Sequence, residues 1–401
     1  MPGTETATTS EQATWCEIDS GALRENMQNL RQAIGSEARL GIVVKSDAYG
    51  HGLLDCARVF VEAGADWLVV HSHGEAVMLR DGGLQQPVLV CGPTQPEEAA
   101  LAVSAWARVV AYDTQVVRAL AEAGRRADAS VPLHLKVETG THRQGVGVDA
   151  IVDLARHVQA ADGVHIEGAC THLADVEDGE EHDFARHQLT ELHRARRRLE
   201  AAGIHIEMWH AASSAAALVL PESRADLVRV GIAAYGLWPS AGIERLTNAV
   251  APNLRLQSAL TWRARVAQVQ DMEPGGSVGY GRTWRAGGRA RRIAILPVGY
   301  HEGFSRARSN QGHVLLRGLP APVRGRVCMN LTMVDVTEVE AATGSPVGVG
   351  EVATLLGTDG DTTISAEQFA SWSGTIHYEI VTRIHPCVPR RRVDARGDLK
   401  G

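Results

Sequence analysis

The chain has 401 residues, of which 44% are hydrophobic, an ordinary content for a globular protein with one large domain and a smaller one. The formal net charge is −7 and the isoelectric point lies near 6.2, so we expect no basic face for a nucleic-acid partner. The six cysteines lie far apart and form no CxxC pair, which predicts reduced thiols and neither a zinc site nor a disulfide framework.

The first residues, 1–13, are rich in Thr, Ser and Glu. They lack the basic start and the apolar segment of a signal peptide, so we predict a disordered tail there. Elsewhere, no apolar stretch approaches the roughly 18 residues that a membrane span requires. We therefore expect a soluble, cytoplasmic protein without a membrane partner.

After residue 19 the chain repeats one theme, a short β-branched run followed by a helical pattern, which is typical of parallel βαβ units. The runs lie at residues 41–45, 67–71, 87–92, 108–113, 132–138, 165–172, 206–211 and 227–233. Eight strand–helix units predict a (β/α)8 TIM barrel over residues 20–252, with its active site at the C-terminal ends of the strands. A doubly wound open sheet is the alternative, but no GxGxxG follows any of the runs.

Residues 253–401 have a different texture, with alternating polar and apolar runs separated by Gly and Pro turns. This pattern predicts a mainly antiparallel β domain. We expect the short run TWCEID, residues 14–19, to form a strand that pairs back with this domain. The segment TIHYEIVTRI, residues 375–384, fits a strand or a helix equally well.

Lys45 is the first candidate for chemistry, because the apolar run GIVV delivers it into the polar, Gly-punctuated turn KSDAYGHG. A lysine amine held at a strand end can be desolvated and brought against a carbonyl, and lysine is the side chain that forms Schiff bases. The alternative interpretation is a charge that merely ends a buried strand.

Other predicted strand ends carry polar residues on the same face of the barrel. They are Lys136, Arg143, His172, His210, Ser213, Ser214, Arg229, Gly231 and Ile232. Each has a structural explanation by itself, such as a helix cap, a hydrogen-bonded core histidine or a buried ion pair. Their convergence predicts a site, with a phosphate cradle where Ser214, Gly231 and Ile232 follow the last two strands. A lysine, a phosphate cradle and no metal cluster together indicate pyridoxal 5'-phosphate.

Nearly the whole chain after the tail resembles the alanine racemase family. The matching motifs occur in the family's order: VVKSDAYGHG, LKVETGTHRQG, THLAD, HAASSAA, RVGIAAYG, VGYGRTW, GRVCMNLTMVDVT and TIHYEIVTRI. The resemblance implies a (β/α)8 barrel with a β domain, bound pyridoxal phosphate, and a head-to-tail homodimer with shared active sites. It also implies racemisation of L- and D-alanine by two bases, supplying D-alanine for peptidoglycan.

Carried over residue by residue, the resemblance makes Lys45 the imine lysine and one catalytic base. It makes Tyr280, in VGYGRTW, the second base, donated by the partner subunit. Arg229 would face the pyridine nitrogen, and His172 would sit between Arg229 and Tyr280. The residues that would hold the phosphate are Tyr49, Ser214, Gly231, Ile232 and Tyr378.

The resemblance assigns three further positions. Lys136 matches a lysine that is carbamylated in many family members, and its carbamate would orient Arg143 near the cofactor and substrate. The backbone amide of Met329 would donate to the substrate carboxylate from the second subunit. No metal ligands are implied.

Three alternatives stay open. The first is a racemase of broader range, acting on serine or larger amino acids, since one methylene is worth only about 1–3 kcal/mol of discrimination. Departures from the family at Ser46, Ser213 and Asn330 put the substrate range in doubt. The second is a decarboxylase that uses the same cofactor. The third is a non-catalytic cofactor carrier, although such proteins resemble the barrel half only.

Overall fold

The computed structural model describes residues 12–177, 179 and 181–394. Its residues form two compact units. The barrel unit comprises Gly21–Ala48 and Gly52–Gln257; the β unit comprises the described residues up to Ser20, the short stretch Tyr49–His51, and the chain from Ser258 onward. Most of the tail predicted over residues 1–13 lies outside the described residues.

The barrel unit contains a strand at each of the eight predicted runs, and all of them pair in parallel. They follow one another in the order β10-β2-β3-β4-β5-β6-β8-β9. Their bounds are β2 (Arg39–Val43), β3 (Trp67–Val70), β4 (Val88–Val90), β5 (Ala107–Ala111), β6 (Val131–Glu138), β8 (Val164–Cys170), β9 (Met208–His210) and β10 (Leu227–Val230), while β7 (Val146–Gly147) pairs with β6.

Backbone hydrogen bonds join the two ends of this sheet. The Asp226 amide donates to the Trp209 carbonyl at 3.0 Å, and the Arg229 amide donates to the Ala212 carbonyl at 3.0 Å. The sheet therefore curls into a nearly closed barrel of sequentially ordered strands. The predicted (β/α)8 barrel is confirmed, and the doubly wound alternative is wrong.

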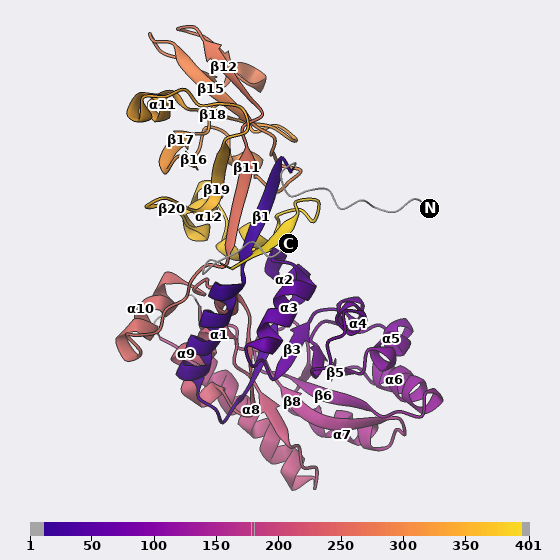
Figure 1. Cartoon of the computed structure of the whole chain (residues 1–401). Helices are drawn as coiled ribbons and strands as arrows, with labels where there is room; N and C mark the ends of the chain where they lie inside the picture. The colour runs from indigo at the N-terminus through magenta and orange to yellow at the C-terminus, as the bar shows by residue number, and fades with distance from the viewer. Residues whose placement is uncertain (1–11, 178, 180, 395–401) are drawn as a thin grey trace. The chain divides into compact units, whose positions relative to one another are not determined.

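Helices alternate with the strands, and Figure 1 shows α4 to α8 on the outside of the sheet. Local signals define their ends: the Asp113 carboxylate accepts hydrogen bonds from the first amides of α6, and Ser72 and Glu75 form a capping box at α4. The bounds are α1 (Ser20–Ile34), α3 (Leu53–Glu62), α4 (His73–Asp81), η1 (Pro96–Glu98), α5 (Ala99–Ser104), α6 (Thr114–Arg126), α7 (Ile151–Gln159), α8 (Asp183–Ala201), α9 (Ser214–Val219), η2 (Pro221–Ser223), η3 (Ile232–Tyr235) and α10 (Ala241–Val250).

The β unit is built on a larger sheet in which the first strand of the chain is internal. Strand β1 (Thr14–Asp19) pairs antiparallel with β11 (Leu260–Arg265) and parallel with β21 (Arg390–Val393). The sheet order is β17-β16-β19-β11-β1-β21, and β11 and β1 lie side by side in Figure 1. The other members are β16 (His313–Leu316), β17 (Leu319–Pro322), β19 (Val352–Asp359) and β20 (Thr362–Ile364), which pairs with β19.

Smaller elements complete the β unit. Strands β12 (Gln268–Met272), β15 (Arg291–Leu296) and β18 (Thr332–Asp335) form an antiparallel sheet, and β13 (Ser277–Val278) pairs with β14 (Trp284–Arg285). The helical elements are η4 (Tyr280–Arg282), η5 (Arg306–Arg308), α11 (Thr337–Thr343), α12 (Ala366–Ser373) and α13 (His377–Thr382). The segment that the sequence left open between strand and helix therefore contains a helix, α13.

A buried arginine lies among the aromatic side chains of the β unit. The guanidinium carbon of Arg308 lies 4.0 Å from the ring centre of Phe369, 4.4 Å from that of Phe304 and 4.8 Å from that of Trp372. Burial lowers the pKa of Arg308 to about 9, so the group stays charged at neutral pH. The three ring faces attract this cation, and Nη2 donates to the His313 carbonyl at 3.0 Å.

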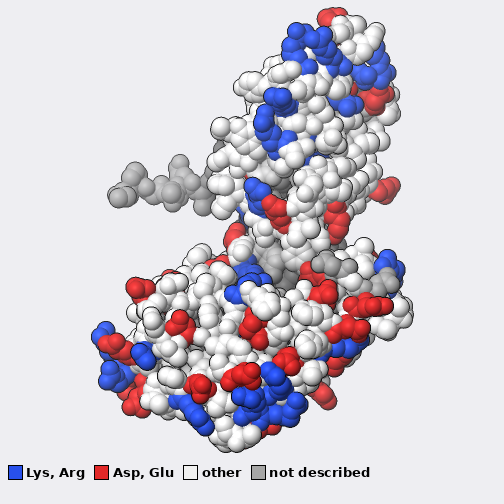
Figure 2. Space-filling model, turned by 180° about the vertical axis from the view of Figure 1, so that it is seen from behind, with Lys and Arg blue, Asp and Glu red and all other residues white. Residues whose placement is uncertain are grey.

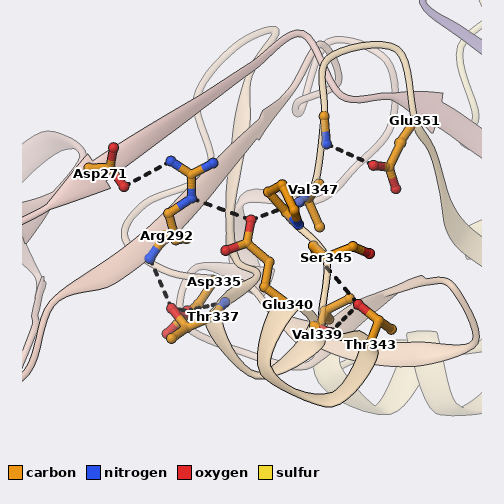
Figure 3. Close-up of polar contacts among 12 residues, drawn as sticks. Asp271, Arg292, Asp335, Thr337, Val339, Glu340, Thr343, Ser345, Val347 and Glu351 are labelled. Carbon is orange, nitrogen blue, oxygen red and sulfur yellow. Dashed lines mark hydrogen bonds and ion pairs between the residues drawn. The ribbon is translucent and has the colours of Figure 1, made fainter.

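Arg292 ties the small sheet to helix α11 (Figure 3). From β15 its Nη1 donates to Asp271 of β12 at 2.8 Å, and its Nε donates to Glu340 of α11 at 3.3 Å. The same Glu340 oxygen accepts the amide of Val347 at 2.8 Å, and the amide of Arg292 donates to Thr337 Oγ1 at 2.9 Å. Arg292 therefore joins strands β12 and β15 to helix α11, and Glu340 extends the contact to the loop that follows the helix.

Charge on the barrel unit is mixed. Lys and Arg are interspersed with Asp and Glu over the face shown in Figure 2, so the described residues of that face present no extended field of one sign. Within the described part of the chain, none of the helices combines the length and the apolar character needed to cross a bilayer.

Candidate active site

Lys45 lies just past a barrel strand. Strand β2 ends at Val43, two residues earlier than the sequence predicted, and Lys45 begins the six-residue helix α2 (Lys45–Gly50). The side chain is half-buried, and its amine makes no hydrogen bond to any described residue. An amine that is held at a strand end without a partner remains available for a ligand.

The turn after Lys45 is left-handed. Ser46, Asp47, Ala48 and Tyr49 have φ values of 56°, 55°, 53° and 53°. Left-handed helical geometry costs an L-residue roughly 1–2 kcal/mol, because Cβ crowds the following carbonyl oxygen. Consecutive residues of this kind persist only where surrounding contacts impose them, and such strain gathers at functional sites.

Two carboxylates hold this turn. Glu75 accepts the amide of Ser46 at 2.6 Å through Oε1, and the amide of His71 at 2.8 Å through Oε2, which ties the turn to the end of β3. Asp47 Oδ1 accepts the amide of Leu53 at 2.8 Å. The direction in which Lys45 leaves the sheet is therefore set by neighbouring strands and helices.

Positive charge is concentrated around the strand ends. Burial lowers the pKa of the Lys136 amine, and the charges of Arg229 and Arg143 lower it further. Burial and then the charges of Arg229, Lys136, Arg143 and Lys45 hold the pKa of His172 well below its usual range. The structure thus places these five predicted residues within electrostatic reach of one another, and His172 is neutral at neutral pH.

Arg229 is the inner end of a hydrogen-bonded chain through the barrel. Its Nη1 lies 2.5 Å from His210 Nδ1, His210 Nε2 lies 2.8 Å from His134 Nδ1, and His134 Nε2 lies 2.9 Å from Glu167 Oε2. Both histidines are fully buried. Arg229 Nη2 also donates to the carbonyls of Thr171 and Ala211, each at 2.9 Å, so its plane is fixed.

Arg229 and Glu167, at the two ends of this hydrogen-bonded series, determine which histidine nitrogens carry a proton. An arginine can only donate, so His210 Nδ1 accepts and His210 Nε2 carries the hydrogen that it donates to His134 Nδ1. His134 Nε2 then donates to the Glu167 carboxylate. Burial, the first cause in each case, holds the pKa of His134 below its ordinary value and that of His210 well below it, which agrees with two neutral rings.

Ser214 gathers backbone donors at the end of the last strand. Its Oγ accepts the amide of Gly231 at 2.8 Å and the amide of Ala233 at 3.5 Å. Ser214 begins α9, and Ile232 begins η3, directly after β10. A hydroxyl and backbone amides that converge in this way are the donor set that suits a phosphate group.

Tyr280 lies in the β unit, in a turn rich in left-handed residues. Gly279, Gly281 and Arg282 have φ values of 67°, 71° and 50°. Gly279 has φ 67° and ψ −173°, a backbone conformation that essentially only glycine adopts, so glycine is required there by conformation. In this turn Tyr280 is 71% exposed.

Met329 shares a cleft with Tyr280. The cleft has a volume of about 1360 Å³, and its walls include Tyr300, His301 and His385. Met329 is 57% exposed. Tyr49 and Tyr378, the other two predicted residues of this unit, are neighbours, because their ring centres lie 6.4 Å apart.

Sequence reasoning missed Glu75, His134 and Glu167. His134 precedes Lys136 by two positions in β6, so strand periodicity places both on one face, and this signal was available. For Glu75, the sequence predicts only a structural role, as the last residue of a capping box at the start of a helix. The contact of His134 with His210 joins strands that are distant in sequence, which a single sequence does not reveal.

The C-terminal mouth of the barrel carries a strand-end amine, fixed cations and a phosphate-type donor set. This is where barrel enzymes have their active sites, so the fold and the site indicate an enzyme of this class. The family models for the N-terminal and C-terminal domains of alanine racemase match residues 18–239 and 259–392. The chain belongs to the alanine racemase family and is an isomerase.

Individual relatives agree in sequence and in fold. An alanine racemase of Symbiobacterium thermophilum is 40% identical over 377 residues, covering 94% of this chain and 96% of the relative. The structure of alanine racemase from Bacillus anthracis with bound L-Ala-P has 30% identity and a TM-score of 0.88, with 97% of each chain covered. A histidine racemase from Leuconostoc mesenteroides has 25% identity and a TM-score of 0.84, covering 97% of this chain and all of that one.

We predict that acid destabilises the protein well before its carboxylates titrate. His134 and His210 have lowered pKa values in the folded state, whereas unfolded histidine titrates near 6.5, so the unfolded chain binds more protons below that pH. The free energy of unfolding should fall as pH drops below 6.5, by up to about 1.4 kcal/mol per pH unit for each of these histidines.

Urea unfolding followed by tryptophan fluorescence between pH 7.5 and pH 5.5 measures this effect. Replacing the exposed histidine, His205→Gln, should leave the pH dependence unchanged. A free energy of unfolding that stays constant over this interval would contradict the assignment of two neutral, buried rings.

Proposed function

We propose that the protein racemises alanine with pyridoxal 5'-phosphate as its cofactor. The observation that carries the proposal is the Lys45 amine, which has no hydrogen-bond partner among the described residues and is held by a strained turn beside the cations of the barrel mouth. The family match over both domains supports it. The C-terminal match also argues against a cofactor carrier made of a barrel alone.

The residues present fit the cofactor. Lys45 would hold it covalently, Ser214 with the amides of Gly231 and Ile232 would hold its phosphate, and Tyr49 and Tyr378 would complete the phosphate contacts. The remaining Nε hydrogen of Arg229 is unpaired among the described residues and suits a ring nitrogen acceptor. When bound, pyridoxal phosphate draws electrons from the substrate's α-carbon and so makes its hydrogen acidic.

The chain's own residues would then move the proton. Lys45 and Tyr280 act on opposite faces of the α-carbon, one removing a proton and the other delivering one, which inverts the configuration. His172 is neutral, so electrostatic help for a developing phenolate would come from Arg229 behind it. The Met329 amide would orient the substrate carboxylate.

Lys45 is expected to be the covalent anchor. Borohydride treatment of the cofactor-loaded protein should leave the cofactor's mass on the peptide that contains Lys45. The chain has only three lysines, Lys45, Lys136 and Lys400, so peptide mapping is unambiguous. Lys45→Ala should lose both this label and racemisation; retained racemisation in that variant would refute the assignment.

We further propose that Lys136 carries a carbamate. Its amine is buried beside Arg229 and Arg143, and the lowered pKa increases the neutral fraction that attacks carbon dioxide. The neutral amine nitrogen bonds to the carbon of carbon dioxide and releases one proton, which gives an anionic carbamate; starting from the ammonium ion, two protons are released in all. The single negative charge of the carbamate would offset part of the positive charge of the two guanidinium groups and orient Arg143.

Carbon-13 NMR of protein equilibrated with labelled bicarbonate should show one slowly exchanging carbamate resonance. Lys136→Met should remove that resonance and leave any signals from exposed amines. A resonance that survives in this variant would place the carbamate elsewhere, and no slow resonance in the parent protein would exclude it.

We also propose a homodimer in which Tyr280 and Met329 serve the partner's site. Their exposure in one cleft of the β unit supports this. Mixing subunits tests it: Lys45→Ala and Tyr280→Phe each lack activity, but a hybrid dimer holds one intact site. With random exchange half of the dimers are hybrids, so about one quarter of the parental activity should return.

The matched control pairs two defects of the barrel unit. Lys45→Ala mixed with Arg229→Ala should show no recovery, because each hybrid site then keeps one defect from its own subunit. Recovery in the control, or none in the test pair, would contradict a site completed across the dimer. Sedimentation of each mixture confirms the oligomeric state.

A broader substrate range is the second candidate, because a histidine racemase shares this fold over the full chain length. A screen of the common amino acids with added cofactor separates it from a strict alanine racemase, and released carbon dioxide would indicate a decarboxylase. We propose that the protein is cytoplasmic and that its product, D-alanine, supplies the synthesis of cell-wall peptidoglycan. Rescue of a D-alanine auxotroph tests this role.

A further inference from the structure

Three metal-binding side chains meet on the surface of the β unit. One ligand atom from each of His301, His385 and Cys387 lies within 4.8 Å of those of the other two. His301 Nε2 lies 3.9 Å from Cys387 Sγ, and the imidazole centres of His301 and His385 are 4.7 Å apart. All three residues are exposed.

The two segments that carry these side chains are fixed by backbone contacts. The amide of His301 donates to the Met329 carbonyl at 2.9 Å, and the amide of His385 donates to the Glu302 carbonyl at 3.1 Å. Glu302 is itself held, since its carboxylate accepts from the Gly299 amide at 2.8 Å and from the Asn330 side chain at 2.7 Å. These contacts fix the backbone that carries His301 and His385, while the exposed side chains keep freedom to rotate.

A turn places the remaining two ligands. The Val388 amide donates to the His385 carbonyl at 3.0 Å, and Arg390 Nη1 donates to the same oxygen at 2.7 Å. This turn brings Cys387 back toward His385, whose Nδ1 accepts the Cys387 amide at 3.1 Å. The Nδ1 lone pair is taken up by this hydrogen bond, so a metal that binds through Nδ1 must displace the Cys387 amide.

The donor set suits zinc. Two imidazole nitrogens and a thiolate are common zinc ligands, and tetrahedral bonds of 2.0–2.3 Å separate nitrogen from sulfur by about 3.6 Å. The observed separation of 3.9 Å between His301 and Cys387 is close to this value, and exposed side chains can close the difference by small rotations. Arg383, which lies nearby on the cleft wall, is paired with Glu379 at 2.5 Å.

We propose that His301, His385 and Cys387 bind a divalent zinc-class cation. Binding forms two nitrogen–metal bonds and one sulfur–metal bond and releases the thiol proton to solvent. Three protein ligands leave a fourth position for water or for a donor atom of another molecule. Because both histidines line the cleft shared with Tyr280 and Met329, the ion would lie at the wall of that cleft.

The cysteine pattern by itself predicts no zinc site, because the ligands are dispersed in the sequence. Cys387 and His301 are 86 residues apart. The site does not depend on the proposed racemase activity, since binding can be measured on the full chain whatever reaction it catalyses.

The first test is a titration of the purified full-length protein with Zn²⁺ against a chromogenic chelator. We expect one ion per chain, with about tenfold or greater loss of affinity in His301→Ala and in Cys387→Ser. Bound Zn²⁺ should also protect Cys387 from alkylation, which peptide mapping reads at that residue alone.

Matched controls separate this site from adventitious binding. Cys328 lines the same cleft outside the cluster, and His205 is exposed on the barrel unit, so Cys328→Ser and His205→Ala should bind Zn²⁺ like the parent. The proposal is overturned if the parent binds no stoichiometric zinc, or if the two cluster variants bind it unchanged. Thermal unfolding of each variant verifies that the fold is retained.

Discussion

Uncompensated positive charge at the barrel mouth is the constraint on which the site depends. Lys136 and Arg229 lie beside Arg143 and Lys45, and the carboxylates of strands β6 and β8 have other partners: Glu138 binds backbone amides, and Glu167 binds His134 and Arg108. Burial and this crowding lower the pKa values of Lys136 and His172 together. An anionic group, such as a carboxylate, a phosphate or a carbamate, would reduce the repulsion among these cations, so the barrel mouth is suited to bind anions.

The series of hydrogen bonds from Arg229 through His210 and His134 to Glu167 stabilises the buried positive charge of Arg229. Burial alone would raise the pKa of the Glu167 carboxyl, but the hydrogen bond from His134 and the charge of Arg108 hold it below its ordinary value. The resulting carboxylate lies at the far end of two neutral imidazoles and orients all their dipoles toward the guanidinium. It thereby stabilises a cation that it does not touch, and fixes the direction in which Arg229 can donate.

All eight barrel strands could be predicted from the sequence, because β-branched runs separated by amphipathic helices are compatible with few other folds. Sequence reasoning missed the left-handed turn after Lys45, since Ser46, Ala48 and Tyr49 carry no residue signal for positive φ, and the contacts of Glu75, Asp47 and the packed neighbours impose it. It left α13 open because six residues with mixed apolar spacing fit either element. Contacts between distant strands, such as His134 with His210, depend on the closed barrel and have no local signature.

The distribution of lysine and arginine in the sequence agrees with a site that needs a neutral amine. Of forty lysines and arginines only three are lysine, and two of these, Lys45 and Lys136, stand at the barrel mouth. An arginine keeps its proton at physiological pH and can serve for surface pairs, for the aromatic box around Arg308, or for a permanent charge such as Arg229. Only an amine can lose its proton and attack a carbonyl or carbon dioxide. Lysine therefore occurs where a deprotonated nitrogen is needed. This distribution favours a chemical role for Lys45 and Lys136 over a role as a simple positive charge.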